Sequence, residues 1–175
     1  MRSRESFDGR HKKEPDPENN KSLDWGVGDP DPSTPFADWT ESEANTLQEY
    51  IWTIRDMLGL NHWDVYLAGQ YSEETAMASV HPLYGRHVAA VYINRNWFSY
   101  TPEDQRNVMV HEMLHVVHNT QTDIVRVGYS STMPSEKTAN SMWTLFERET
   151  ELMVDHLANM IAGFFPLMRQ GTNGQ

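Results

Sequence analysis

The sequence predicts an α+β fold with an N-terminal helix, a small and mostly antiparallel sheet, and two further helices towards the C-terminus. Apolar residues recur every three or four positions in three segments, as in helices that pack on a core. Between the first and second of these segments, short runs rich in apolar and β-branched residues are typical of strands. The chain of 175 residues suggests one domain, which we place at residues 36–175.

Two of the predicted helices have clear N-terminal signals. Thr40 and Glu43 form a capping box, and the helix that follows them ends near Gly59. Thr101 precedes Pro102 and two acidic residues, an order that is typical of an N-cap, a proline at the first helical position and an acidic first turn. The helix that starts there carries the most specific motif of the chain.

The remaining elements are predicted from periodicity and from turn residues. Three strands are expected, over residues 63–68, 75–80 and 87–94. The turn-prone segment 81–85 joins the last two. After the second helix we expect a connection of about 20 residues that contains Gly128 and Pro134. A long C-terminal helix should then run over residues 135–163.

Residues 1–35 differ from the rest of the chain. They hold six basic and eight acidic side chains and few apolar ones. A segment of this composition buries too little apolar surface to offset the entropy that it loses on folding. We therefore expect a disordered tail rich in proline and charge.

Charge and composition exclude several classes of partner and compartment. The net charge is −11, and no basic patch stands out, which argues against nucleic acid or an anionic membrane as the main partner. The N-terminus has no apolar signal segment, and no apolar run is long enough to span a membrane. We expect a cytoplasmic or otherwise intracellular protein, and the sequence leaves its oligomeric state open.

Residues 111–115, His-Glu-Met-Leu-His, form an HExxH pattern inside the second predicted helix. Residues four apart lie on the same face of a helix, so His111 and His115 can bind one metal ion. Glu112 lies about 100° around the helix axis, where it can reach the water that the ion carries. The chain has no cysteine, so histidine and carboxylate are the ligands available to zinc.

A catalytic zinc usually takes a third protein ligand. Glu151 is the best candidate, because Asp155 follows it one helical turn later and can accept a hydrogen bond from a ligand histidine. Glu147, one turn before Glu151, is the alternative and lacks such an aspartate. A third histidine with the spacing HExxHxxGxxH is excluded, because His118 and Gln121 occupy the glycine and histidine positions.

The two motifs, HExxH at 111–115 and ExxxD at 151–155, resemble those of the gluzincin group of zinc metallopeptidases. The resemblance implies a zincin-like fold whose long C-terminal helix carries the third ligand. It implies that His111, His115 and Glu151 bind the metal, that Glu112 is the catalytic base, and that Asp155 is the partner of a ligand histidine. It also implies one Zn²⁺ per chain and a metalloendopeptidase that acts on a protein or peptide substrate.

Other readings stay open at this point. The protein is alternatively a zinc-binding interaction or structural protein without turnover, in which Glu112 has no catalytic task. By the same resemblance, the strand at 75–80 pairs with an extended substrate, although it can equally be an internal strand. An oxyanion donor is expected from Tyr129, Arg126 or His118.

Overall fold

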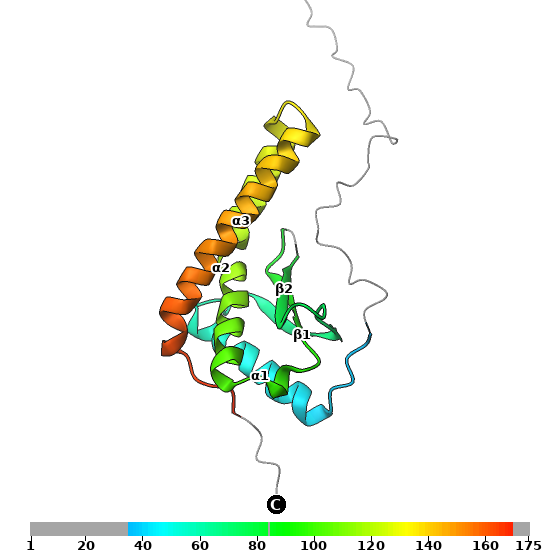
Figure 1. Ribbon diagram of the computed structural model, residues 1–175, viewed down its shortest axis with the longest axis vertical. Helices are drawn as coiled ribbons and strands as arrows, with labels where there is room; N and C mark the ends of the chain where they lie inside the picture. The colour runs from blue at the N-terminus through cyan, green and yellow to red at the C-terminus, as the bar shows by residue number, and fades with distance from the viewer. Residues whose placement is uncertain (1–34, 84, 170–175) are drawn as a thin grey trace, which may run out of the picture.

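The computed structural model of the protein describes residues 35–83 and 85–169 (Figure 1). Its elements are α1 (Glu41–Met57), β1 (Asp64–Tyr71), β2 (Ala78–Pro82), β3 (Val88–Ile93), the 3₁₀ turn η2 (Trp97–Ser99), α2 (Pro102–Thr132), α3 (Glu136–Ile161) and the 3₁₀ turn η3 (Ala162–Phe164). The α+β class is therefore confirmed. The predicted tail at residues 1–35 lies outside the described residues except for Pro35.

Helices α1 and α2 begin where the sequence predicts. The Thr40 side chain accepts a hydrogen bond from Glu43 N, and the Glu43 side chain accepts one from Thr40 N. The Thr101 side chain accepts from Asp104 N at the start of α2, with Pro102 as the first helical residue. Both caps work because the first turn of a helix leaves its N–H groups without helical partners.

The sheet is mixed, and the prediction of a mostly antiparallel sheet was wrong. Its strand order is β1-β3-β2, with β3 parallel to β1 and antiparallel to β2. The second strand also begins later than predicted, at Ala78 instead of residue 75. The hydroxyl of Ser72 and the side-chain amide of Asn94 both donate to the Ala76 carbonyl, at 2.9 and 2.8 Å. These polar contacts hold the segment before Ala78 as a turn.

Helices α2 and α3 form a long antiparallel hairpin (Figure 1). The predicted connection of about 20 residues was wrong, since α2 continues to Thr132 and only residues 133–135 join it to α3. Gly128 lies inside α2 because one helical glycine costs only about 1 kcal/mol relative to alanine, which packing against a second helix can offset. Pro134 does mark the break. No helix in the described part of the chain is both long and apolar enough to cross a membrane.

The hydrophobic core lies between one face of the sheet and the helices. Val65 on β1 and Val91 and Ile93 on β3 are completely buried there. The helical side of the core consists mainly of Leu47, Ile51 and Ile54 from α1 and Met109, Val110, Met113 and Val116 from α2. This packing fixes the first half of α2 against the sheet, which is the half that carries the HExxH motif.

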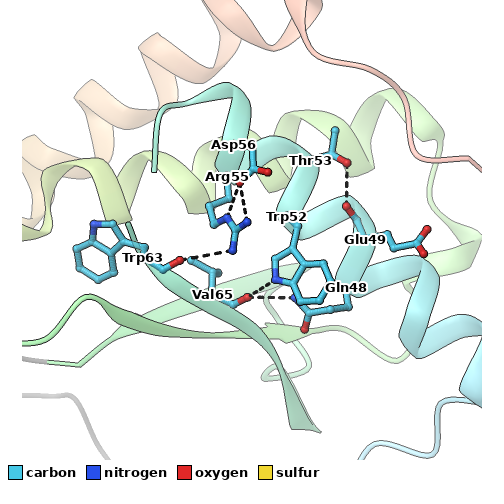
Figure 2. Close-up of polar contacts among 8 residues, drawn as sticks. All are labelled: Gln48, Glu49, Trp52, Thr53, Arg55, Asp56, Trp63 and Val65. Atoms are coloured by element: carbon cyan, nitrogen blue, oxygen red, sulfur yellow. Dashed lines mark hydrogen bonds and ion pairs between the residues drawn. The ribbon is translucent and has the colours of Figure 1, made fainter. Parts of the chain in front are cut away.

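The two edges of the sheet differ. At the β1 edge, the carbonyl of Val65 accepts hydrogen bonds from Gln48 Nε2 and Trp52 Nε1 of α1, both at 3.0 Å (Figure 2). Gln48 Oε1 accepts from Leu67 N at 2.7 Å. Side chains of α1 thus cover the polar groups that an edge strand offers to other chains. At the other edge, no strand of the described residues pairs with the outer side of β2, which faces α2.

Candidate metal centre

Helices α2 and α3 bring together the residues of the two sequence motifs. His111 and His115 lie one turn apart on α2, and their side chains are about one-fifth exposed, at 20% and 21%. Glu151 faces them from α3, which runs antiparallel to α2. Glu112 is buried, with 8% of its surface exposed. The short connection between the helices sets this register.

The side-chain atoms of His111, His115 and Glu151 converge on one point. The two Nε2 atoms lie 3.1 Å apart. Glu151 Oε2 is 3.6 Å from Nε2 of His111, and Glu151 Oε1 is 3.3 Å from Nε2 of His115. All of these ligand atoms lie within 4.8 Å of one another, so the three residues form a group that could hold a metal ion.

The donor set and its spacing fit zinc. Two imidazoles and one carboxylate are a common protein set for a zinc site that keeps its fourth position open. With metal–ligand distances of about 2.0–2.2 Å, neighbouring ligand atoms of a tetrahedral site lie about 3.3–3.6 Å apart. The three separations of 3.1, 3.3 and 3.6 Å are close to that range. The metal-binding cluster defined by His111, His115 and Glu151 therefore needs little adjustment to accept the ion.

Asp155 lies where the ExxxD motif predicts a partner for a ligand histidine. Its Oδ1 is 2.9 Å from Nδ1 of His111, on the side of the imidazole that points away from the cluster. Nδ1–H donating to Asp155 leaves Nε2 free to bind a metal. Glu147, the alternative third ligand, is not part of the cluster. It lies one turn before Glu151 on α3 and only adds a negative charge near that residue.

The environment sets the protonation of two groups at the centre. Burial, followed by the charges of His111 and His118, lowers the pKa of His115 to about 4. The imidazole is therefore neutral at pH 7, which is the form that binds metals. Burial raises the pKa of Glu112 to about 8, although the backbone N–H of Val80 donates a hydrogen bond to its carboxylate and opposes this rise. A carboxyl group whose pKa lies near neutrality can both accept and release a proton.

Two cavities flank the cluster along β2, and both are lined by His111 and Glu112. The first cavity, of about 280 Å³, is lined by the start of β2 at Met77 and Ala78 and by Asp155 and its neighbours on α3. The second cavity, of about 330 Å³, is lined by Ser79, Val80, Pro82, His111, Glu112, His115, Asn119, Thr122 and Glu151. The cluster thus lies at the junction of two hollows that follow the open edge of the sheet.

The three side chains expected as oxyanion donors do not line these two cavities within the described residues. Tyr129 and Arg126 lie 14 and 11 residues beyond His115 on α2, about 21 and 16 Å along the helix axis. His118 lines a notch on another face of the hairpin, where its Nδ1 lies 3.5 Å from Oε1 of Gln121. Tyr129 and Arg126 lie this far from the cluster because α2 continues to Thr132, where the sequence predicted a loop.

Asn119 is a polar residue of the second cavity that the sequence analysis missed. A usable signal was present, since Asn119 continues the series of positions 111 and 115 by one more helical turn. This one-turn spacing was not extended to residue 119, because the sequence predicted a connection of about 20 residues before the C-terminal helix.

Comparisons of the chain with protein-family models, with curated proteins and with solved structures find no match. The case for a function therefore depends on the geometry of the metal-binding cluster and its surroundings.

Proposed function

We propose that the protein is a zinc-dependent peptidase of gluzincin type and zincin-like fold, in which Glu112 is the general base. The observation that carries the proposal is the position of Glu112. It adjoins the cluster, lines both cavities, and has its carboxylate fixed by the Val80 N–H. A zinc site with a purely structural task does not need a buried carboxyl group beside its open position.

Each residue then has a defined task in peptide hydrolysis. His111, His115 and Glu151 would hold a zinc ion, which would supply the positive charge that polarises a peptide carbonyl and lowers the pKa of water at the site. Glu112 accepts a proton from that water as its oxygen attacks the carbonyl carbon. It donates the proton to the amine nitrogen when the C–N bond breaks. Asp155 keeps the His111 ring oriented through Nδ1.

The open edge of β2 favours an extended polypeptide as the substrate. An unpaired strand edge can add one more strand through main-chain hydrogen bonds. The β2 edge borders both cavities, whereas side chains of α1 cover the β1 edge. Neither cavity has a lysine or arginine among its described lining residues, which disfavours nucleic acid. A peptide that lies along β2 would bring internal bonds to the cluster, as an endopeptidase requires.

The experiment that tests this proposal compares the wild-type protein with Glu112→Gln. The substitution keeps the shape of the side chain but removes its ability to accept a proton. We expect the variant to bind one zinc per chain in native mass spectrometry, as the wild type does. Hydrolysis of a mixed peptide library, followed by mass spectrometry, should fall by about 10²–10⁴-fold.

Three outcomes would contradict the proposal. Equal cleavage by the wild type and Glu112→Gln would show that Glu112 is not the base. Zinc binding without any cleavage by the wild type would favour a zinc-binding interaction or structural protein. Failure of the wild type to bind zinc would remove the basis of both functions.

A further inference from the structure

Asn119 is the most deeply buried polar residue of the second cavity besides Glu112, with 8% of its surface exposed. Its Nδ2 donates to Asp123 Oδ2 at 3.3 Å. The same oxygen accepts from Gly85 N at 3.4 Å, in the turn between β2 and β3. Asp123 thus holds the Asn119 amide from the sheet side. Within the described residues, the other Nδ2 hydrogen and Oδ1 have no hydrogen-bond partner in the protein, and Oδ1 is not sealed from solvent, so both can meet a molecule that enters the cavity.

The hydrogen-bond pattern of β2 shows which backbone groups point into the cavities. Asn94 N donates to Met77 O, and Leu83 N donates to Val88 O, so residues 77 and 83 pair with β3 through hydrogen bonds. Antiparallel pairs alternate in this respect. The N–H and C=O groups of Ala78 and Val80 and the C=O group of Pro82 therefore point outwards, towards the open edge. The hydrogen bond from Val80 N to Glu112 agrees with this assignment.

Donors are scarce along the part of this edge that borders the second cavity. Val80 N–H is occupied by Glu112. Pro82 has no N–H at all, which is tolerated because its nitrogen faces the open edge. At this end the backbone of β2 offers carbonyl acceptors to a substrate but no free N–H donor. Beside the first cavity, by contrast, Ala78 offers both a donor and an acceptor.

We propose that Asn119 binds a main-chain peptide group of the substrate in the second cavity, supplying the hydrogen-bond donor that the backbone of β2 lacks there. This assignment rests on the proposed peptidase function. A peptide group has one donor and one acceptor, and the free half of the Asn119 amide has one of each. Asn119 lies one turn, about 6 Å, beyond His115, or about two residues of extended chain. It therefore binds the substrate within two residues of the bond to be cleaved.

The chemistry of the cavity favours this occupant over a chain terminus. A terminal carboxylate would lie near the carboxylates of Asp123, Glu112 and Glu151, and none of the described lining residues is a lysine or arginine. A terminal ammonium group has only donors and would leave the free Asn119 N–H unsatisfied. A neutral peptide group satisfies both free positions. Because the contact is made to the main chain, Asn119 sets the register of the substrate and not a preference for side chains.

The test compares Asn119→Leu with the control Gln121→Leu, which also replaces a side-chain amide by leucine, on an exposed residue two positions further along α2. Substrates are a mixed library of hexapeptides blocked at both ends. For Asn119→Leu we expect kcat/KM to fall by about tenfold to a hundredfold, mainly through KM, with unchanged zinc content. The preferred residues around the cleaved bond should not change. Gln121→Leu should behave as wild type. Asn119→Asp, which keeps size but has no donor, should resemble Asn119→Leu and covers the case in which leucine disturbs folding.

An unchanged KM in both Asn119 variants would overturn the inference, and so would a new side-chain preference. If the zinc-loaded wild type cleaves nothing, the proposed function fails, and a binding measurement decides on Asn119 separately. Retention of the same library is then measured on immobilised, zinc-loaded Glu112→Gln with and without Asn119→Leu. Weaker retention with Asn119→Leu supports the main-chain contact, and equal retention overturns it.

Discussion

Helices α2 and α3 lie side by side along their length, yet the two ends of this hairpin have different surroundings (Figure 1). Near the sheet, α2 buries Gln105, Met109, Val110, Glu112, Met113, Leu114 and Val116, and α3 buries Val154 and Ala158. In the arm, which we define as residues 124–146, only Arg126 is buried. The arm extends past the tip of the β2–β3 turn, whereas the other end packs on the sheet.

This difference in burial indicates which end of the hairpin can hold a metal site. Ligand atoms must be held within a few tenths of an ångström, and packed side chains provide that rigidity. The metal-binding cluster accordingly lies where α2 rests on the sheet. In the arm, stability comes mainly from contacts between the two helices, such as the Arg126 guanidinium over the Trp143 ring at 5.3 Å. Three predictions test whether this division holds.

The largest effect is expected on zinc affinity, in a comparison of alanine substitutions at glutamates on two neighbouring turns of α3. Glu151→Ala removes a ligand of the cluster, while Glu147→Ala makes the same change one turn towards the arm. Loss of a residue that only supports a ligand typically weakens metal binding by 10–100-fold, so loss of Glu151 should cost about a hundredfold or more. Glu147→Ala should leave affinity nearly unchanged. Competition with a chelating dye measures both, and the reverse result would make Glu147 the third ligand.

A smaller effect is expected for stability, from two valines of α2. Val116 is 1% exposed and packs on the core, while Val127 is 45% exposed in the arm. Val116→Ala should lower the free energy of unfolding by about 1.5–3 kcal/mol, through lost burial and a residual cavity. Val127→Ala should change it by less than about 0.5 kcal/mol. The gain in helix propensity is the same in both, so it cancels in the comparison. Urea unfolding measures both values, and equal losses would show that the arm is packed as tightly as the body.

The smallest effect is expected at Gly128, inside the arm. Its φ angle is not positive, and a Cβ atom built there meets nothing within 4 Å. Gly128→Ala should therefore stabilise the protein by about 0.5–1 kcal/mol, because glycine costs that much in a helix interior. Thermal unfolding detects this as a small rise in Tm. A destabilised variant would instead indicate that the chain leaves the helix at Gly128, as the sequence alone suggested.

Much of the candidate site followed from spacing alone. His111 and His115 are neighbours on any helix that contains them, and Asp155 lies one turn beyond Glu151 for the same reason. The spacing also favoured Glu151 over Glu147, and in the structure Glu151 groups with the two histidines while Asp155 contacts His111. Local signals at Thr40 and Thr101 fixed two helix starts, since capping depends only on residues within one turn.

Other features depended on contacts between distant segments. The sequence predicted the β2–β3 turn, but not that β3 would lie between β1 and β2. From the sequence, Gly128 was predicted to lie in a loop, because glycine has a low helix propensity. That propensity takes no account of the packing of α2 against α3, which keeps Gly128 helical. The spacing puts Asn119 one turn beyond His115, but its place at the second cavity depends on β2 and α2 lying together.

The sequence by itself therefore determined which residues share a helix face at the candidate metal centre and where the caps lie, because both arise from intervals of three or four residues within a helix. The tertiary structure decided which edge of the sheet stays open, how far α2 extends, and which polar side chains border the cluster. These outcomes arise from packing between segments far apart in the chain, and no local pattern encodes that packing. The hydrogen bond from Val80 N–H to Glu112 is an example, since it joins a strand edge to the helix that carries the motif.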